Sequence, residues 1–269
     1  CPDFFRPILR IILSPYYFMA KSTFKKVDYL SAMSQEYIDW IHKFSKRKSK
    51  NIDLITPLTS KLRNNSALEL FQAEKWWSNF NVSKKNIRRF CFVGYFNSMY
   101  DFKIIKELAL KYLEEKVDCQ FVLCGSGGQA FVKVKKLFSG IDNVIFPGWI
   151  DPPKIEYLSQ CCVGSIMPYK NIENFKLNIT NKVSDSLAYG LPIITTLEGA
   201  LKKLIEENEI GFYCSEKSKE DLYSCSKLIL DNKELRKKFS FNARKLYIKN
   251  FECKTVYDNL VHSLERITK

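Results

Sequence analysis

Short apolar runs rich in β-forming residues alternate with helical patterns from residue 88 to the end of the chain, and this alternation most restricts the fold. The expected strands are 89–94, 120–125, 143–146, 163–167, 192–196 and 210–214. The expected helices are 102–116, 129–138, 153–160, 181–189, 201–207, 218–231, 233–248 and 253–268. Strands that alternate with helices in this way form a parallel sheet with helices on both faces. The sequence therefore predicts a doubly wound, Rossmann-like α/β domain.

The first 88 residues have a different pattern. The expected elements here are a strand at 27–32, a helix at 35–44 capped by Ser34, a strand at 51–57 and a helix near 68–77. Pro7 and Pro15 are expected to break any helix in the apolar N-terminal stretch. The chain also starts with Cys1 in the middle of a pattern, as a fragment of a longer protein would. We interpret 1–57 as the tail of a truncated upstream α/β domain and 58–88 as a linker with a helix.

The composition argues against several classes of protein. Nine cysteines without a CxxC pair, and two histidines, indicate neither a zinc site nor a disulfide framework. We therefore expect no metal and a reducing, cytoplasmic compartment. No apolar run reaches the roughly 18 to 20 residues that cross a bilayer.

The formal charge of +14 is unevenly distributed, because residues 1–65 contain 12 Lys and Arg against 5 Asp and Glu. Such a segment attracts anionic lipid, nucleic acid or phosphorylated substrates, although a solvated loop is its commonest meaning. No recognition helix, zinc finger or aromatic RNA-binding motif accompanies the charge, so we expect no nucleic acid as partner.

The stretch 171–196, NIENFKLNITNKVSDSLAYGLPIITT, has the features of an anion site. A capped helix starts at Thr180, Asn181 and Lys182, and the carboxylate of Asp185 follows one turn later. The free amides and the dipole at a helix N-terminus bind phosphate, and a lysine in the first turn is unfavourable unless a negative ligand faces it. An ordinary surface helix followed by a strand is the alternative.

Further residues lie at or just past the ends of expected strands, namely Gly94, Gly125, Gly148, Tyr169 and Thr196. Ligands of open α/β sheets bind outside the carboxyl ends of the strands, so we expect these residues to rim one crevice. Gly125 also opens a GSGG run that lacks the full GxGxxG pattern and is expected to form a tight turn.

Five segments stand in an order that is typical of a known family: FVGYFNSMYDFKII, QFVLCGSGGQ, NVIFPGWID, ITNKVSDSLAYGLPIITT and EENEIGFYC. Over about residues 51–268 the chain resembles the C-terminal, donor-binding domain of GT-B-fold glycosyltransferases of family 4. It is most similar to the bacterial subgroup that builds capsule, lipopolysaccharide or exopolysaccharide. The resemblance implies that 89–250 binds a nucleotide sugar, that 251–269 crosses back toward the N-terminal domain, and that 1–57 belongs to that acceptor-side domain.

The resemblance also implies an activity. A sugar would pass, with retention, from a nucleoside-diphosphate sugar, UDP- or GDP-linked, to a lipid-linked or polysaccharide acceptor. No metal or other cofactor is required in the family. The enzyme would be cytoplasmic, or peripheral at the anionic inner face of the plasma membrane, and this chain would be inactive without its missing half.

Residue by residue, the resemblance places the diphosphate of the donor at Thr180, Asn181, Lys182 and Gly94, and the ribose at Asp185. The nucleobase would lie against a loop formed by Gly148, Trp149 and Ile150. Gly125 and Tyr169 would complete the rim.

The chain departs from the family pattern at two positions. Leu177 stands where the family usually has the first of two glutamates, and Tyr95 replaces an arginine that grips the diphosphate in many members. Asp101 resembles an acid of the subgroup, but we interpret it as a cap of the next helix. No residue is assigned as catalytic base.

Two alternatives remain at this stage. A sugar-nucleotide 2-epimerase shares the two-domain fold but relies on acidic and histidine groups around the cleft, whereas His42 and His262 fall outside the expected crevice. The other alternative is a non-catalytic subunit that binds sugar nucleotides, which Leu177 and Tyr95 would favour.

Overall fold

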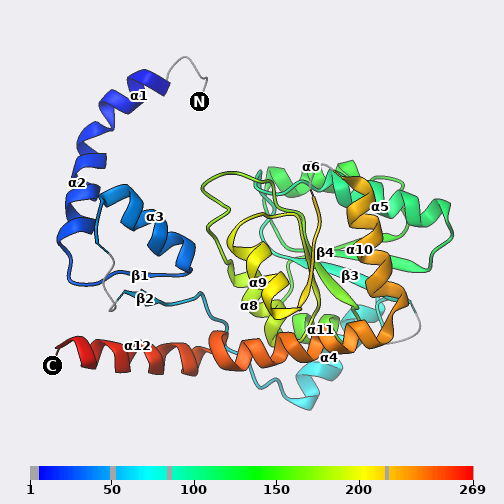
Figure 1. Cartoon of the computed structure of the whole chain (residues 1–269). Helices are drawn as coiled ribbons and strands as arrows, with labels where there is room; N and C mark the ends of the chain where they lie inside the picture. Colours follow the sequence, from blue (N-terminus) through cyan, green and yellow to red (C-terminus); the bar gives the residue numbers. More distant parts are fainter. Residues whose placement is uncertain (1–5, 49–52, 84–86, 216–217, 269) are drawn as a thin grey trace. The chain divides into compact units, whose positions relative to one another are not determined.

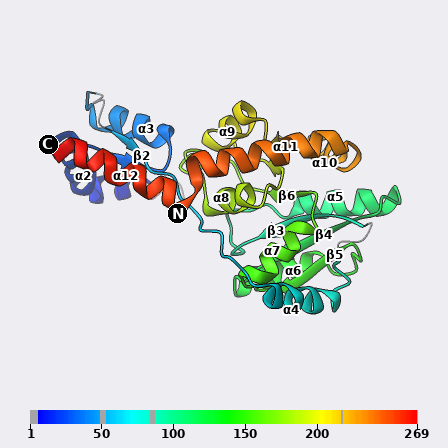
Figure 2. The ribbon, with the colours of Figure 1, turned by 90° about the horizontal axis from the view of Figure 1, so that it is seen from below.

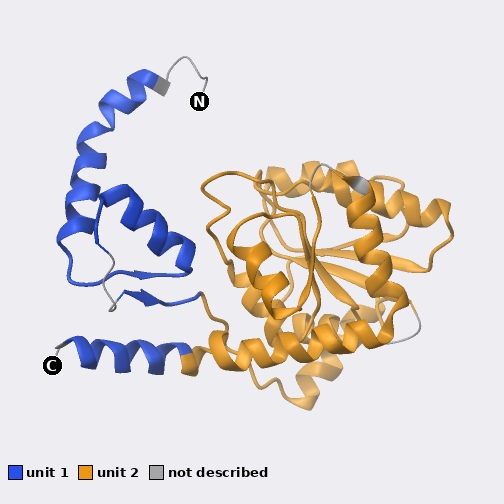
Figure 3. Ribbon diagram, viewed as in Figure 1, with its two compact units in different colours: residues 1–57, 256–269 blue, residues 58–255 orange. Residues whose placement is uncertain are grey.

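The computed structural model describes residues 6–48, 53–83, 87–215 and 218–268. The chain forms two compact units, residues 1–57 with 256–269 and residues 58–255 (Figure 3). We call them unit 1 and unit 2 and describe each by itself.

Unit 1 is small and mostly helical. Its elements are α1 Arg6–Ile12, α2 Ser14–Lys26, β1 Ser31–Ala32, α3 Gln35–Ser45, β2 Leu54–Ile55 and most of α12 Cys253–Thr268. The two short strands pair in parallel. β1 is shorter than the predicted strand at 27–32, and β2 covers two residues of the predicted strand at 51–57, of which 51 and 52 lie outside the described residues. As predicted, Ser34 caps α3, because its hydroxyl accepts a hydrogen bond from the Tyr37 amide at 3.3 Å. No described helix of the chain is both long and apolar enough to cross a membrane.

The expectation that Pro7 and Pro15 break any helix near the N-terminus is wrong. Pro7 is the second residue of α1, and Pro15 lies at the start of α2. Proline is tolerated in the first turn of a helix, where the backbone amide has no intrahelical partner and the fixed φ suits the helix. The prolines therefore start these helices.

Unit 2 is built on a parallel sheet of six strands (Figures 1 and 2). The strands are β3 Arg88–Val93, β4 Cys119–Cys124, β5 Val144–Gly148, β6 Gly164–Met167, β7 Ile193–Thr195 and β8 Gly211–Tyr213. The helices are α4 Ala67–Ser78, α5 Lys103–Glu114, α6 Gln129–Leu137, α7 Pro152–Gln160, α8 Asn181–Ala188, α9 Ala200–Asn208, α10 Lys219–Asp231 and α11 Lys233–Leu246. A π-helical turn, η2 Tyr247–Phe251, precedes α12. The order β5-β4-β3-β6-β7-β8 confirms the predicted doubly wound sheet.

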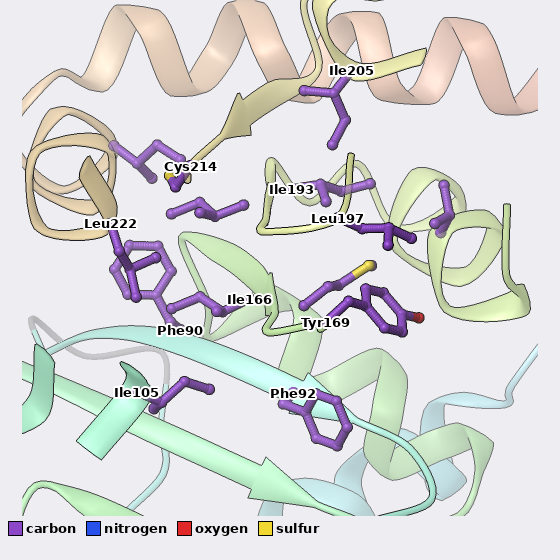
Figure 4. Packing of buried hydrophobic residues seen from close by; sticks show 14 of the residues in the cluster. Phe90, Phe92, Ile105, Ile166, Tyr169, Ile193, Leu197, Ile205, Cys214 and Leu222 are labelled. Carbon is purple, nitrogen blue, oxygen red and sulfur yellow. The ribbon is translucent and has the colours of Figure 1, made fainter. Parts of the chain in front are cut away.

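The sheet is buried on both faces because side chains of a strand alternate between them. Phe90 and Phe92 of β3 belong to the larger apolar cluster, part of which is drawn in Figure 4. Cys91, between them, belongs to a second cluster with Trp77 of α4 and Leu158 of α7. Figure 2 shows α4 and α7 on one side of the sheet and α5 on the other. Continuous apolar strands of this kind are typical of a parallel sheet that is covered by helices on both faces.

The order of the strands also locates a crevice. Within the sheet, the first strand is β3, and the next two strands, β4 and β5, are added on one side of it. The chain then crosses back to form β6 on the other side of β3. Crevices of doubly wound sheets open at such a switch point, outside the carboxyl ends of the strands. The loops that follow β3 and β6 meet there, since the Asp101 amide donates to the Pro168 carbonyl at 2.7 Å and the Lys170 amide to the Met99 carbonyl at 2.9 Å.

Candidate functional site

Helix α8 begins at the switch point, directly after the loop that follows β6. Thr180 is its N-cap by backbone conformation, as predicted, but the predicted cap is wrong for the side chain. The Thr180 hydroxyl lies 2.7 Å from the hydroxyl of Tyr169 and accepts no hydrogen bond from an amide of α8. The Thr180 hydroxyl is hydrogen-bonded to the buried Tyr169 hydroxyl instead of to the helix backbone. The first amides of α8 are therefore left without this side chain as a cap.

Lys182, in the first turn of α8, lies against aromatic rings. Its Nζ is 5.2 Å from the ring centre of Tyr100 and 5.6 Å from that of Phe92. No salt bridge joins Lys182 to any residue that the structure describes. Burial lowers the pKa of Lys182, and the charge of Asp185 opposes this shift only in part. Lys182 is thus a half-buried cation without an ion pair.

Gly94, the first residue after β3, provides the space that Lys182 occupies. A Cβ atom at position 94 would lie 2.0 Å from Cε and 2.5 Å from Nζ of Lys182. Two residues assigned to the diphosphate, Gly94 and Lys182, are therefore in direct contact. Gly94 directly follows β3, and Lys182 lies on α8, which follows β6, the neighbour of β3 in the sheet.

Asp185 follows Lys182 by one turn and is open to solvent. Desolvation raises the pKa of its carboxyl, while a hydrogen bond from the Ser60 side chain and the charge of Lys182 lower it. Asp185 and Lys182 both line one pocket, which is open to solvent. Its other lining residues are Cys91, Val93, Ile155, Leu158, Ser159, Ser165, Ser186, Tyr189 and Leu191.

The predicted nucleobase loop is only partly accessible. Gly148 ends β5 with φ +86°, and its carbonyl accepts from the Gly125 amide at 2.7 Å. Trp149 is 69% exposed, so its ring is free to stack on a planar ligand. The side chain of Ile150 is 4% exposed and packs in the cluster of Trp77, so only the backbone of this residue is left to face a base, and its assignment stays a prediction.

The predicted rim is also corrected at three positions. Tyr169 is completely buried, and its ring packs at a tilt against the rings of Tyr100 and Phe175. Thr196 is buried as well, and its hydroxyl donates a hydrogen bond to the Tyr169 carbonyl at 2.6 Å. Gly125 is buried under the neighbouring strand end, where a Cβ would meet the Gly94 carbonyl. These residues support the floor of the site and do not reach its surface.

The remaining predictions concern single positions. The Asp101 carboxylate accepts a hydrogen bond from the Lys103 amide at 3.1 Å, but the N-cap of α5 is Phe102, so Asp101 lies one residue before the position at which we expected it to cap the helix. Tyr95 is 60% exposed beside Gly94. Sequence reasoning missed Tyr100, whose ring faces Lys182, and Ser60, whose hydroxyl accepts a hydrogen bond from Ser184 beside Asp185. No local motif marks these contacts, which join distant parts of the chain.

The arrangement suits an anion flanked by a polyol. A desolvated ammonium near the start of a helix binds a phosphate, and a carboxylate one turn on accepts hydrogen bonds from hydroxyl groups. No described cluster of three or more His, Cys, Asp or Glu residues is arranged to hold a metal ion.

Comparison with known proteins agrees with this fold. A sucrose-phosphate synthase from Thermosynechococcus elongatus superposes with a TM-score of 0.73 at 14% identity, over 95% of this chain and 62% of that protein. A glycosyltransferase from Rickettsia africae gives 0.74 at 17%, over 93% and 67%. Anabaena HepE, solved in complex with UDP-glucose, gives 0.71 at 14%, over 94% and 68%. The chain thus spans about two thirds of these proteins or less, and such identities show a shared fold.

No curated protein matches the sequence. The model of one family, glycosyl transferases group 1, matches residues 74–246, well over half of the chain. Those residues contain β3 to β8 and every residue of α8 discussed above. The fold is the Rossmann-like α/β half of a GT-B enzyme, and the chain belongs to the glycosyl transferases group 1 family.

Proposed function

We propose that unit 2 binds the nucleoside diphosphate of a sugar nucleotide and that the protein transfers the sugar to an acceptor. The observation that carries this proposal is the half-buried, unpaired ammonium of Lys182 in the first turn of α8. Both burial and the helix dipole disfavour a cation there, and a bound diphosphate offsets both costs. A UDP-glucose complex of a protein with the same fold supports a nucleotide sugar as the ligand.

Each residue then has a role. The diphosphate binds at Gly94, the α8 amides of Asn181 and its neighbours, and Lys182, while Asp185 accepts hydrogen bonds from the ribose and Trp149 lies beside the base. As the bond from the anomeric carbon to the diphosphate oxygen breaks, negative charge grows on the leaving group. Lys182 stabilises that charge more strongly in the transition state than in the ground state.

The finer proposal is a retaining transfer of a hexosyl or N-acetylhexosaminyl group by a family 4 enzyme of the capsule, lipopolysaccharide or exopolysaccharide type. The donor would be UDP- or GDP-linked, and no metal cofactor would take part. We also propose that residues 1–269 alone do not catalyse transfer, because the acceptor site belongs to the other half of the two-domain fold. The family match favours transfer over epimerisation. His42, moreover, is bonded to Asp53 within unit 1.

The Asp185→Asn variant tests the ribose assignment. We expect about fivefold to tenfold weaker binding of UDP or GDP by calorimetry, because the amide keeps only one of two acceptor oxygens and loses the charge that strengthens both bonds. Asp142→Asn, which changes an exposed carboxylate before β5, serves as control and is expected to have no effect. Wild-type protein that binds no nucleotide at all would contradict the proposal.

A second proposal concerns the acceptor. Helices α1 and α2 expose a group of large apolar side chains, among them Ile11, Tyr16 and Phe18, at 70–75%. Residues 6–26 contain five Lys and Arg and no acidic residue. Basic residues beside exposed apolar side chains attract anionic lipid, and we propose that these helices hold the enzyme at the cytoplasmic face of the plasma membrane, beside a lipid-linked acceptor.

Sedimentation with vesicles at low salt measures this binding. The chain is expected to sediment with phosphatidylglycerol vesicles and much less with phosphatidylcholine vesicles, and Phe18→Asp is expected to weaken binding about tenfold. Phe241→Asp is a matched control, because Phe241 is a similarly exposed phenylalanine on α11. If the chain stays in the supernatant with both lipids, the proposed membrane binding is contradicted, and the apolar surface of α1 and α2 is then assigned to a contact with protein.

A further inference from the structure

Thr180 has the backbone of a capping residue but does not cap α8 with its side chain. Its φ of −83° and ψ of 164° are extended, as they are in the usual N-cap. Five other described helices follow a serine, aspartate or asparagine, and in each the side chain accepts a hydrogen bond from the amide three residues later; they are α3, α4, α7, α10 and α11. The sequence thus provides α8 with a cap that the folded protein does not use.

A buried phenol holds the Thr180 hydroxyl instead. The hydroxyl oxygens of Thr180 and Tyr169 are 2.7 Å apart, and Tyr169 is completely buried in the larger apolar cluster (Figure 4). Tyr169 is itself fixed in place, because the rings of Tyr100 and Phe175 pack against its ring and its carbonyl accepts from the Thr196 hydroxyl. A buried hydroxyl is costly to leave without a partner, so this bond is retained whichever oxygen donates.

The fate of the Thr180 hydroxyl matters to the site, because a capping side chain and a bound anion compete for the same amides. The first amides of a helix have no intrahelical partner, and either group satisfies them. In α8 the Val183 amide donates to the Thr180 carbonyl at 2.9 Å, and the amides of Asn181 and Lys182 precede it in the first turn. A threonine hydroxyl that turned toward α8 would occupy this turn. Held at Tyr169, it leaves the turn to a ligand.

We propose that Tyr169 is a positioning residue for the nucleotide site, which keeps the Thr180 hydroxyl away from α8 so that the first-turn amides remain available to the diphosphate. This inference rests on the proposed function, since it requires a diphosphate at the start of α8. Tyr169 does not meet the ligand, because it is completely buried, and it acts through Thr180. The free helix forgoes the stabilisation of a cap, and the bound anion supplies it.

The Tyr169→Phe variant tests the inference, because it removes one oxygen and keeps the ring. Thr180 then loses its partner and caps α8, so the ligand has to displace a cap. The ligand is UDP or GDP, whichever the wild type binds more tightly. Tyr169→Phe is expected to weaken its binding about fivefold by calorimetry, the effect of one N-cap hydrogen bond. The melting temperature of the free protein is expected to change little, since the new cap replaces the lost bond.

Tyr112→Phe is the matched control. It also removes a completely buried phenol hydroxyl that is bonded to another hydroxyl, since the oxygens of Tyr112 and Ser226 are 2.6 Å apart. This pair joins α5 to α10 and takes no part in α8. Tyr112→Phe is expected to leave nucleotide affinity unchanged. Equal weakening by Tyr112→Phe and Tyr169→Phe overturns the inference, because loss of any buried hydroxyl would then have the same effect.

The Thr180→Val background separates positioning from a structural role, because valine has the shape of threonine but cannot cap a helix. In this background Tyr169→Phe is expected to have no effect on affinity, and the double variant is expected to bind more tightly than Tyr169→Phe alone. A merely structural role of the phenol predicts equal weakening in both backgrounds. A Thr180 hydroxyl that contacts the diphosphate directly predicts a double variant that binds no more tightly than Tyr169→Phe. Either result overturns the inference.

A crystal structure of unliganded Tyr169→Phe provides the second measurement. The Thr180 Oγ1 atom is expected within hydrogen-bonding distance of the Lys182 or Val183 amide. A hydroxyl that stays directed at residue 169, or turns to solvent, overturns the inference. Absence of nucleotide binding by the wild type overturns the inference and the proposed function together. If the wild type binds and Lys182→Ala weakens binding, but Tyr169→Phe does not, only the role of Tyr169 is overturned.

Discussion

Replacement of Lys182 by alanine is expected to weaken binding of UDP-glucose or a GDP-linked sugar about 100-fold. A hydrogen bond to a charged group contributes about 1.5–3 kcal/mol, and the upper part of this range applies because burial weakens competition from water. Lys133→Ala, on α6, removes an exposed lysine and is the matched control for loss of net charge. Calorimetry measures both, and equal affinity of wild type and Lys182→Ala would contradict the site.

The same lysine predicts a pH dependence. The diphosphate of a nucleotide sugar stays ionised across the neutral and alkaline range, so Lys182 sets the alkaline limit of binding. Because burial lowers the pKa of Lys182, the ammonium is lost at a lower pH than in an exposed lysine. Affinity is expected to fall as the pH rises through this lowered value. Lys182→Ala is expected to lack this step.

Gly94→Ala is expected to weaken nucleotide-sugar binding about 30-fold with little change in thermal stability. The added Cβ would lie 2.0 Å from Cε of Lys182, which is the flexible end of a side chain, so the lysine moves and the strand remains. The backbone at Gly94 does not have the positive φ that would exclude alanine. The loss therefore arises from misplacement of the ammonium, which calorimetry and the melting temperature together distinguish from unfolding.

A double mutant provides the decisive control for Gly94→Ala. If the substitution acts through Lys182, it adds little once the lysine has been replaced, so the combined loss is expected to stay near that of Lys182→Ala alone. Additive losses would instead mean that Gly94 contacts the ligand independently, or that the alanine disturbs the loop after β3.

The fold was predictable because its signals are local. Strands such as Arg88–Val93 are buried on both faces, so apolar residues occupy consecutive positions, and helices between them repeat their apolar residues with the helical period. Pro15 shows the limit of this reasoning. The same residue either ends a helix or starts one, and only its position relative to the first turn decides between the two.

The candidate site was predictable only where it follows the chain. The start of α8 and the carboxylate of Asp185 lie within one motif, and the assignments of Gly94 and Lys182 await the binding measurements. The diversion of the Thr180 hydroxyl to Tyr169 and the hydrogen bond from Ser184 to Ser60 depend on side chains that meet only after folding. Ser60 and Ser184 are separated by 124 positions, and no periodicity or cap signal extends so far.

The pairing of 59–60 with 251–252, in which Ser60 forms a parallel bridge with Glu252, places the two ends of unit 2 next to each other. Its two ends lie side by side in parallel, although almost 200 residues separate them in the sequence. A gene segment for 58–255 therefore encodes a unit whose N-terminus and C-terminus are close together. Such a unit is suited to circular permutation, in which a short linker joins the old ends and new ends are opened in another loop. Within unit 2, the first and last residues are therefore neighbours in space.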